Sequence, residues 1–331
     1  MDCNYDNERG EDMQAIQFRA PIGSEDAFAL IAVHDACREV DRVMDGLSFE
    51  YLPSVNGYRD RLANTDPNDW IVVQSGSEVV GYGQTLSPWG EHNGKQVYLH
   101  RGWIKPSARG QGIGRELLSR LEARCLEKRA LDGTAGEAEF AANASGTEEA
   151  AQRLLRAAGY LPIYTAMEMR FAPSQTLAVS PLPPGLTLRP VLPEHHRALW
   201  QCIGDAYYVH GADNQGRQIA TEDGFKGYFP PDVDPSLWFA AWEPSRIAGV
   251  VLCRVKNDVA DIYEVSVAHW HRRKGLAKAL LTAALAELRS RNLSAIRIVT
   301  WRENPSEAWR LYEAVGFQTV KEFPRWRKPM T

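Results

Sequence analysis

The sequence of 331 residues predicts a mixed α/β fold made of two tandem domains, each with a central mixed β-sheet flanked by helices. The loop "RGQGIG" (residues 109–114) has a near twin in "RRKGLA" (residues 272–277). Each loop follows an apolar strand pattern and precedes a Leu- and Ala-rich helical pattern. Each half then has a helical run that closes on Gly-aromatic, "AAQRLLRAAGY" and "EAWRLYEAVGF". A period of roughly 160 residues is too long for a solenoid and fits two domains.

The elements of the two halves can be matched in order along the chain. Each half opens with a short strand pattern, at residues 15–22 and 186–192, and continues with helical segments. An Asp-Pro-x-x-Trp motif then precedes two apolar strands joined by a turn, with Gly81 or Gly249 in the second strand, which is a hairpin pattern. A third strand, the loop with its helix, a further strand, a helix and a last strand follow. Because hairpins are mixed with helices, we expect an α/β fold of the α+β, mixed-sheet kind.

The chain divides into four predicted segments. Residues 1–14 are acidic and polar and are expected to form a flexible tail. The N-terminal domain is expected over residues 15–171 and the C-terminal domain over residues 186–331. Between them, residues 172–185 are rich in Pro and Ser and break both helix and strand periodicity, which predicts a linker.

Composition excludes several classes of function. A net charge of −4 and a pI of about 6.1 give no electrostatic footprint for nucleic acid and no polybasic patch for a membrane. No apolar run is long enough to cross a bilayer, and the polar start is not a signal peptide. The five cysteines are scattered without a C-x-x-C pair, so we expect reduced thiols in a cytoplasmic protein, with no disulfide frame and no metal. The sequence carries no signal for an oligomeric state.

The second loop has the features of an anion site. Leucines at 276, 280, 281, 285 and 288 give the following helix one apolar face, so the loop places unpaired backbone N–H groups at a helix N-terminus. Those donors and the helix dipole favour an anion such as a phosphate. A strand-to-helix turn without a ligand is the alternative. A Rossmann or P-loop nucleotide site is disfavoured, because no acidic residue ends a second parallel strand and the Walker lysine is absent.

Together with "NPSEAWRLYEAVGF" (residues 304–317), the loops resemble the GNAT superfamily of N-acetyltransferases. This stretch looks like the family's second signature, in which Asn is followed by Ala, Leu-Tyr and Gly-Phe. The resemblance covers nearly the whole chain as two copies, a tandem layout similar to the mycothiol-synthase type. It implies acetyl-CoA as co-substrate, with its pyrophosphate on the loop and its pantetheine along the preceding strand. The residues implied in cofactor binding are Val265, Val267, Arg272, Arg273, Lys274, Gly275, Leu276, Ala277 and Asn304 in the second half, and Ile104, Arg109, Gly110, Gln111, Gly112, Ile113 and Gly114 in the first.

The resemblance also implies direct acetyl transfer, which needs a base for the acceptor ammonium and an acid for the leaving CoA thiolate. The family's usual acid is the tyrosine of Leu-Tyr-x-x-x-Gly-Phe, which is Tyr312 here. Leu155 occupies the matching position of the first half and cannot donate a proton. The alternative for Tyr312 is a core aromatic residue.

The base is expected on the strand before the second loop, where Asp261 and Glu264 stand. Residues three apart on an ideal strand face opposite sides, although a bulge alters this. At the same offsets the first half has Tyr98 and Arg101, neither of which is a carboxylate. For each acid, a solvent-facing strand residue is the open alternative.

We therefore expect an acetyl-CoA-dependent N-acetyltransferase whose chemistry lies in residues 186–331, acting on a primary amine of a small molecule rather than a protein. The first half is expected to be non-catalytic, whether or not it binds acetyl-CoA. Residues 205–218 and 223–235 lie where the acceptor pocket is expected. Two alternatives stay open at this point, a mycothiol-synthase-like thiol-metabolite acetyltransferase and a non-catalytic acyl-CoA-binding regulatory protein.

Overall fold

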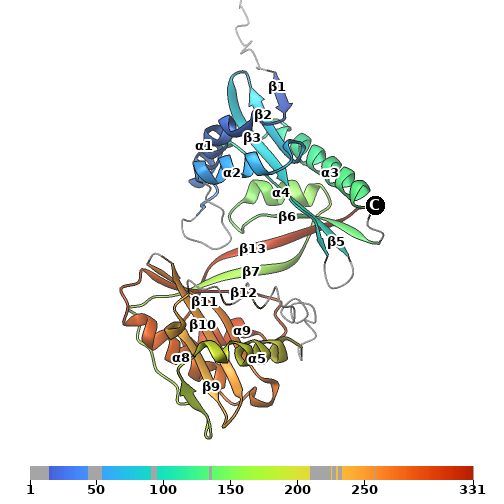
Figure 1. The fold of residues 1–331 in the computed structure, drawn as a ribbon. Coiled ribbons are helices and arrows are strands. Elements are labelled where there is room, and N and C mark those ends of the chain that lie inside the picture. Colours follow the sequence, from blue (N-terminus) through green and yellow to red (C-terminus); the bar gives the residue numbers. More distant parts are fainter. Residues whose placement is uncertain are drawn as a thin grey trace, which may run out of the picture.

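The computed structural model describes residues 15–43, 54–90, 95–133, 136–208, 225, 229, 233–256 and 258–330. The tail predicted over residues 1–14 lies outside these residues, as does most of the pocket region predicted at 205–218 and 223–235. The predicted mixed α/β fold is confirmed, because helices flank a sheet that contains both parallel and antiparallel pairs (Figure 1).

The two halves contain matching series of elements. The first half comprises β1 (Ile16–Arg19), α1 (Ala27–Arg38), α2 (Val55–Asn64), β2 (Trp70–Ser75), β3 (Glu78–Thr85), β4 (Trp89–Gly90), β5 (Gln96–Ile104), α3 (Ile113–Asp132), β6 (Ala138–Asn143), α4 (Glu149–Ala157) and β7 (Leu161–Phe171). The second comprises β8 (Thr187–Arg189), α5 (His196–Tyr208), β9 (Trp238–Trp242), β10 (Ile247–Lys256), β11 (Val259–Val267), α8 (Leu276–Arg289), β12 (Ala295–Trp301), α9 (Ala308–Val315) and β13 (Gln318–Pro329). Within the described ranges, no helix is long and apolar enough to cross a membrane.

The last strands of the two halves are exchanged. The strand order through the middle of the sheet is β6-β13-β7-β12, so β13 pairs with β6 of the first half and β7 pairs with β12 of the second. In Figure 1 these two strands, red and green, cross between the two lobes. Each lobe is therefore completed by backbone hydrogen bonds to the other half's last strand. Nothing local in the sequence predicts this exchange, because the partner of each last strand lies far away along the chain.

Helices cover both faces of each lobe. In the second lobe, α8 and α9 pack on one face of the sheet and α5 packs on the other. The glycine repeated in the second hairpin strand explains how closely α8 sits, since a Cβ on Gly249 would lie 3.1 Å from side-chain atoms of Leu276 and Leu280. The first lobe is arranged likewise, with α1 and α2 on one face and α3 and α4 on the other.

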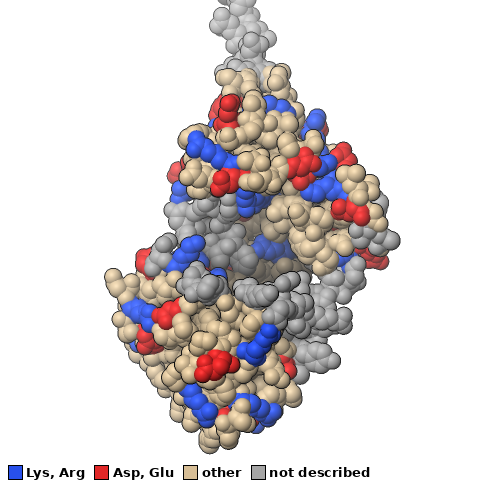
Figure 2. Space-filling model, in the orientation of Figure 1, with Lys and Arg blue, Asp and Glu red and all other residues tan. Residues whose placement is uncertain are grey.

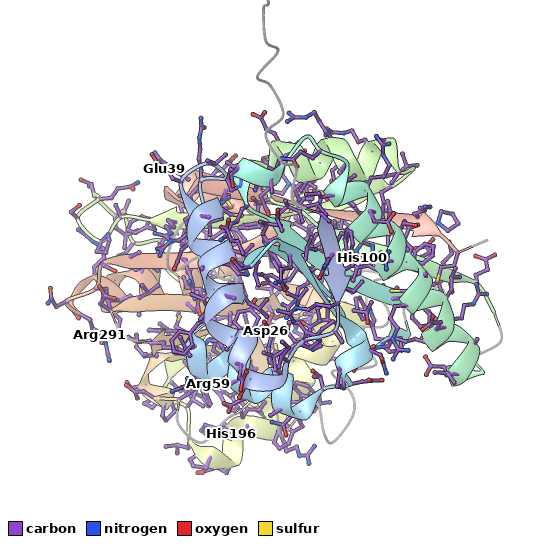
Figure 3. All side chains as sticks on the ribbon, turned by 90° about the horizontal axis from the view of Figure 1, so that it is seen from above. Asp26, Glu39, Arg59, His100, His196 and Arg291 are labelled. Atoms are coloured by element: carbon purple, nitrogen blue, oxygen red, sulfur yellow. The ribbon has the colours of Figure 1, made fainter. Side chains whose placement is uncertain are left out.

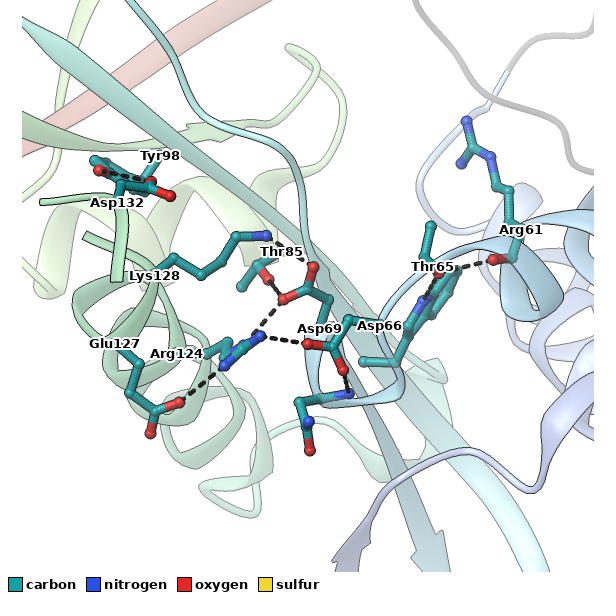
Figure 4. Close-up of polar contacts among 12 residues, drawn as sticks. Arg61, Thr65, Asp66, Asp69, Thr85, Tyr98, Arg124, Glu127, Lys128 and Asp132 are labelled. Carbon is teal, nitrogen blue, oxygen red and sulfur yellow. Dashed lines mark hydrogen bonds and ion pairs between the residues drawn. The ribbon is translucent and has the colours of Figure 1, made fainter. Parts of the chain in front are cut away.

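The repeated Asp-Pro-x-x-Trp motif anchors the helix that follows each loop. Asp66 accepts a hydrogen bond from the Asn68 amide at 2.9 Å. It also forms an ion pair with Arg124 of α3 at 2.9 Å. Arg124 also contacts Asp69, as Figure 4 shows. In the second half, Asp234 and Arg291 make the corresponding ion pair at 3.6 Å. The duplicated motif therefore fixes the loop helix against the start of the hairpin in both lobes.

Candidate active site

The candidate site of the second half lies where two parallel strands separate. The pairing of β11 with β12 ends at Ile262 and Ile298, whereas β11 continues to Val267 and β12 to Trp301. Val265 and Val267, predicted to offer backbone groups to the cofactor, lie on this separated part of β11. A gap between diverging strands beside a helix N-terminus can receive an extended ligand along unpaired backbone.

Both glycine loops adopt the same backbone conformation. The φ angles are +61° at Arg273 and +83° at Gly275, and +80° at Gly110 and +83° at Gly112. Alternating left-handed residues turn nearby N–H groups toward one side, which makes a concave anion site. Across the described part of the chain, no backbone acceptor outside the loop helices takes a hydrogen bond from the amides of residues 110–114 or 273–277. Each loop can therefore offer several backbone donors to a phosphate.

The loop arginines are themselves held by the protein. Arg272 donates to the carbonyl oxygens of Val267 at 3.2 Å and of Ala206 at 2.5 Å, and burial lowers its pKa. Arg109 makes a two-bond contact of 2.8 and 2.6 Å with Asp41, which raises the pKa of Arg109. Each guanidinium therefore ties its loop to the first helical region of its half.

The remaining predicted loop residues divide into anchors and exposed groups. Leu276 and Ile113 are buried at the first position of their helices and anchor the loops to the two cores. The exposed members are Arg273, Lys274, Gly275, Gly110, Gln111 and Gly112, and the half-buried members are Ala277, Gly114 and Ile104. The Asn304 side chain accepts from Ser306 and shapes the turn before α9.

Tyr312 reaches the strand gap from α9. Its side chain is only 5% exposed and packs in the core that α8 covers. Burial, with the charge of Glu264 as a second cause, raises the pKa of Tyr312, so the hydroxyl stays protonated at neutral pH. A phenol that keeps its proton is suited to donating it to a ligand.

A β-bulge in β11 places both predicted acids on one face of the sheet. Leu252 of β10 pairs with Glu264, but the next residue of β10 pairs with Ile262, so Tyr263 is the extra residue of the bulge. Ile262 and Val265 consequently both face the α8 core although they are three residues apart. Their neighbours Asp261 and Glu264 therefore both face the opposite side, which carries α5.

The two acids have different surroundings on that face. Asp261 is bound by Arg297, with one contact of 3.0 Å, and by Arg254 at 3.3 Å. Glu264 is 4% exposed and accepts a hydrogen bond from the Ser266 hydroxyl at 2.5 Å. Asp261 thus lies in the paired part of β11 and β12, whereas Glu264 lies two residues beyond the last paired step, where its charge acts on Tyr312.

The first half has the same gap without the same groups. The pairing of β5 with β6 ends at Leu99 and Ala141. Beyond it stands Arg101, which donates to Gln84, and Leu155 is buried where the second half has Tyr312. No group of three or more His, Cys, Asp or Glu side chains in the described ranges could hold a metal ion.

Sequence reasoning missed two side chains of the second-half site. Ser266 donates a hydrogen bond to Glu264. Its position could have been found from the sequence, because residues two apart on a strand face the same side. Arg297 holds Asp261 from the neighbouring strand, and only the register of β11 with β12 reveals that contact.

Comparison with known proteins identifies the class to which this fold and site belong. The model of the acetyltransferase (GNAT) family matches residues 36–160 and 201–317, one region in each half. The chain belongs to this family, and it is an acyltransferase built from two tandem GNAT domains.

Two curated relatives and one solved structure match a large part of the chain. A mycothiol acetyltransferase of Thermobispora bispora is 25% identical over 309 residues, covering 91% of this chain and 95% of that protein. A mycothiol acetyltransferase of Pseudarthrobacter chlorophenolicus is 27% identical over 228 residues, and that match spans 65% of each protein. The crystal structure of a GCN5-related N-acetyltransferase from Sphaerobacter thermophilus has a TM-score of 0.71 at 22% identity, covering 95% of both chains, which supports the fold.

Proposed function

We propose that the second half transfers the acetyl group of acetyl-CoA to a primary amine of a small molecule. The observation that supports this most directly is that Glu264 stands just beyond the last paired step of β11 with β12, where its charge acts on the buried Tyr312, next to a loop of unpaired amides. The first half has the loop but neither group, since Leu155 and Arg101 stand instead. On this proposal the first half is non-catalytic.

The proposed mechanism needs three proton transfers. Glu264 accepts one proton of the acceptor ammonium, and the free amine then attacks the thioester carbonyl. Tyr312 protonates the CoA sulfur as the C–S bond breaks, and the nitrogen gives its remaining extra proton to the tyrosine oxygen. Tyr312 keeps its proton until the CoA thiolate forms, because burial and the Glu264 charge both raise its pKa. The backbone amides of residues 273–277 hold the diphosphate of acetyl-CoA, so the binding energy of the remote end positions the acetyl group.

Glu264 suits the role of base better than Asp261 does. Two guanidinium groups occupy the carboxylate oxygens of Asp261. We infer that Asp261 acts as a positioning residue for the end of the paired strands. Glu264→Gln should remove the acidic limb of the kcat/KM pH profile and lower kcat by about 100-fold or more. Asp261→Asn should instead lower Tm while keeping the shape of that profile. The opposite pattern would reverse the two assignments.

The relatives named mycothiol acetyltransferase favour one class of acceptor, an amine on a pseudodisaccharide precursor of a thiol metabolite. Acetyl-CoA turnover should be compared among such an amine, a polyamine and free amino acids. The strongest kcat/KM for the pseudodisaccharide amine would support this second candidate, and a preference for another small amine would exclude it.

Tyr312→Phe tests the proposed chemistry. It removes one oxygen atom and should reduce kcat about 100- to 10,000-fold while leaving the Kd of acetyl-CoA unchanged. Tyr98→Phe is the matched control, because Tyr98 is also buried but lies in the first half, where its hydroxyl contacts Asp132 at 3.2 Å. Unchanged turnover in Tyr312→Phe would contradict the assignment.

A further inference from the structure

The first half retains a cavity where the second half has its chemistry. The cavity has a volume of about 130 Å³ and lies between α1, the separated end of β5, the turn after β6, and β13. Because β13 belongs to the second half of the sequence, both halves build its wall. Ligand pockets for drug-sized molecules are about 300–1,000 Å³, so this one has room for a molecule of amino-acid size and not for a coenzyme.

Three charged side chains line the cavity. Arg101 enters from β5, Arg325 from β13 and Glu148 from the residue before α4. The remaining polar wall includes His34, which burial and the charge of Arg101 keep neutral by lowering its pKa to about 4. Two cationic groups and one anionic group are thus presented to one small space.

The positions of these groups are fixed by the fold. Arg101 directs Nε and Nη2 to the Gln84 side-chain oxygen at 3.1 and 2.6 Å, which orients the guanidinium plane. Glu148 accepts from the Ser145 amide at 2.6 Å, which orients its carboxylate. The sheet order places β5 and β13 on either side of β6, so the Cα atoms of the two arginines lie roughly 10 Å or more apart.

Burial also makes an ionic ligand favourable here. Burial lowers the pKa of Arg325, which also hydrogen-bonds Tyr164, and burial raises the pKa of Glu148, so ionised groups in this cavity are poorly solvated. Carboxylates bind guanidinium groups in a two-bond geometry, and an ammonium is the matching donor for a carboxylate.

We propose that this cavity is a binding site for a small amino dicarboxylic acid of the aspartate type. Its two carboxylates pair with Arg101 and Arg325, and its ammonium pairs with Glu148. The ligand carries two negative charges and one positive charge, which complement the two positive charges and one negative charge of the wall. The site does not depend on the chemistry proposed for the second half.

The test is calorimetric titration of the full-length protein without acetyl-CoA, with L-aspartate as the probe. L-Asparagine lacks one carboxylate and succinate lacks the ammonium, so each should bind at least about tenfold more weakly, a loss of about 1.4 kcal/mol. Arg325→Gln should weaken L-aspartate binding by a similar factor. Arg302→Gln is the control, because Arg302 pairs with Glu322 at the surface, and it should bind L-aspartate as the wild type does.

Glu148→Gln separates charge recognition from loss of fold. It should abolish the preference for L-aspartate over succinate while the protein still melts cooperatively. If Arg325→Gln does not fold, Arg101→Gln replaces it in the same titration. The proposal is overturned if L-aspartate fails to bind at about 10 mM, well above a Kd of about 1 mM. It is also overturned if the three ligands bind equally, or if binding survives unchanged in the folded arginine variant.

Discussion

Gly275 tests whether the conformation of the second loop controls acetyl-CoA binding. Its φ is +83°, and a Cβ there would meet nothing within 4 Å. Alanine in the left-handed region costs about 1–2 kcal/mol, and the open space adds no steric cost inside the protein. The loop of Gly275→Ala should relax toward negative φ when free, and a bound diphosphate must restore the left-handed turn. We therefore expect acetyl-CoA to bind about 5- to 30-fold more weakly, the equivalent of about 1–2 kcal/mol.

Calorimetric titration of acetyl-CoA measures this effect, and Gly133→Ala is its control. Gly133 caps the other end of the first-half helix α3, with φ +61° and no atom near a Cβ. Its replacement should cost similar stability, visible as a Tm decrease of about 2–4 °C per kcal/mol, without changing the Kd of acetyl-CoA. Equal affinity in wild type and Gly275→Ala would refute the reasoning from loop conformation. Equal weakening in both variants would refute the location of the site.

The same titration counts the sites. Because Gly110 and Gly112 give the first loop the same conformation as the second, we expect two acetyl-CoA molecules per wild-type chain. Gly112→Ala should weaken one of the two without changing turnover by the second half. One site per wild-type chain, abolished by Gly275→Ala, would make the first half a scaffold only.

Two further predictions concern stability. Burial lowers the pKa of His34 to about 4 and of His100, which lies inside the first half (Figure 3), to about 3, from 6.5 when unfolded. The unfolded chain therefore binds more protons between pH 6.5 and 4, so denaturant unfolding should show stability falling as pH falls through this range, and a flat profile from pH 7 to 5 would contradict it. Because β7 and β13 are exchanged, residues 15–171 and 186–331 expressed separately should each be largely unfolded by circular dichroism and should fold when co-expressed. A folded, monomeric half would count against that dependence.

Local sequence patterns predicted the parts of the fold that depend on neighbours in the chain. The loop glycines, the helix that Leu276 begins and the Asp-Pro-x-x-Trp turns all formed where the patterns placed them. These features follow from backbone preference and helical periodicity, which act within a few residues. The tandem GNAT interpretation was confirmed for the same reason, since its motifs are contiguous.

The site depended on contacts that no local pattern encodes. The bulge at Tyr263 decides which way Glu264 faces, and it arises from the register of β11 against β10. The difference between Asp261 and Glu264 comes from Arg297, which is 36 residues away from Asp261. Sequence offsets therefore identified both acids but could not separate a residue tied into an ion pair from one that lies at the gap.

The face of the second lobe that carries both acids includes side chains from the first half. Glu168 of β7 is fully buried beside β12, where it accepts from Arg170 at 3.3 Å. The hydrogen bond with Asp261, and to a smaller extent the charge of Glu168, raise the pKa of Arg297. Arg297 in turn holds Asp261. On the surface seen in Figure 2, the molecule is hollowed between the two lobes that these strands join.

This arrangement explains why a half without proton-transfer groups would be kept intact. Replacing a first-half acid or tyrosine leaves the exchanged strand β7 in place, so the second lobe keeps its sheet and its charge network. Losing β7 would instead leave the edge of β12 unpaired. It would also expose Arg297 of β12, which orients Asp261. On the function proposed above, the first half can therefore lose its chemistry without harm to the second lobe, but it cannot lose its fold.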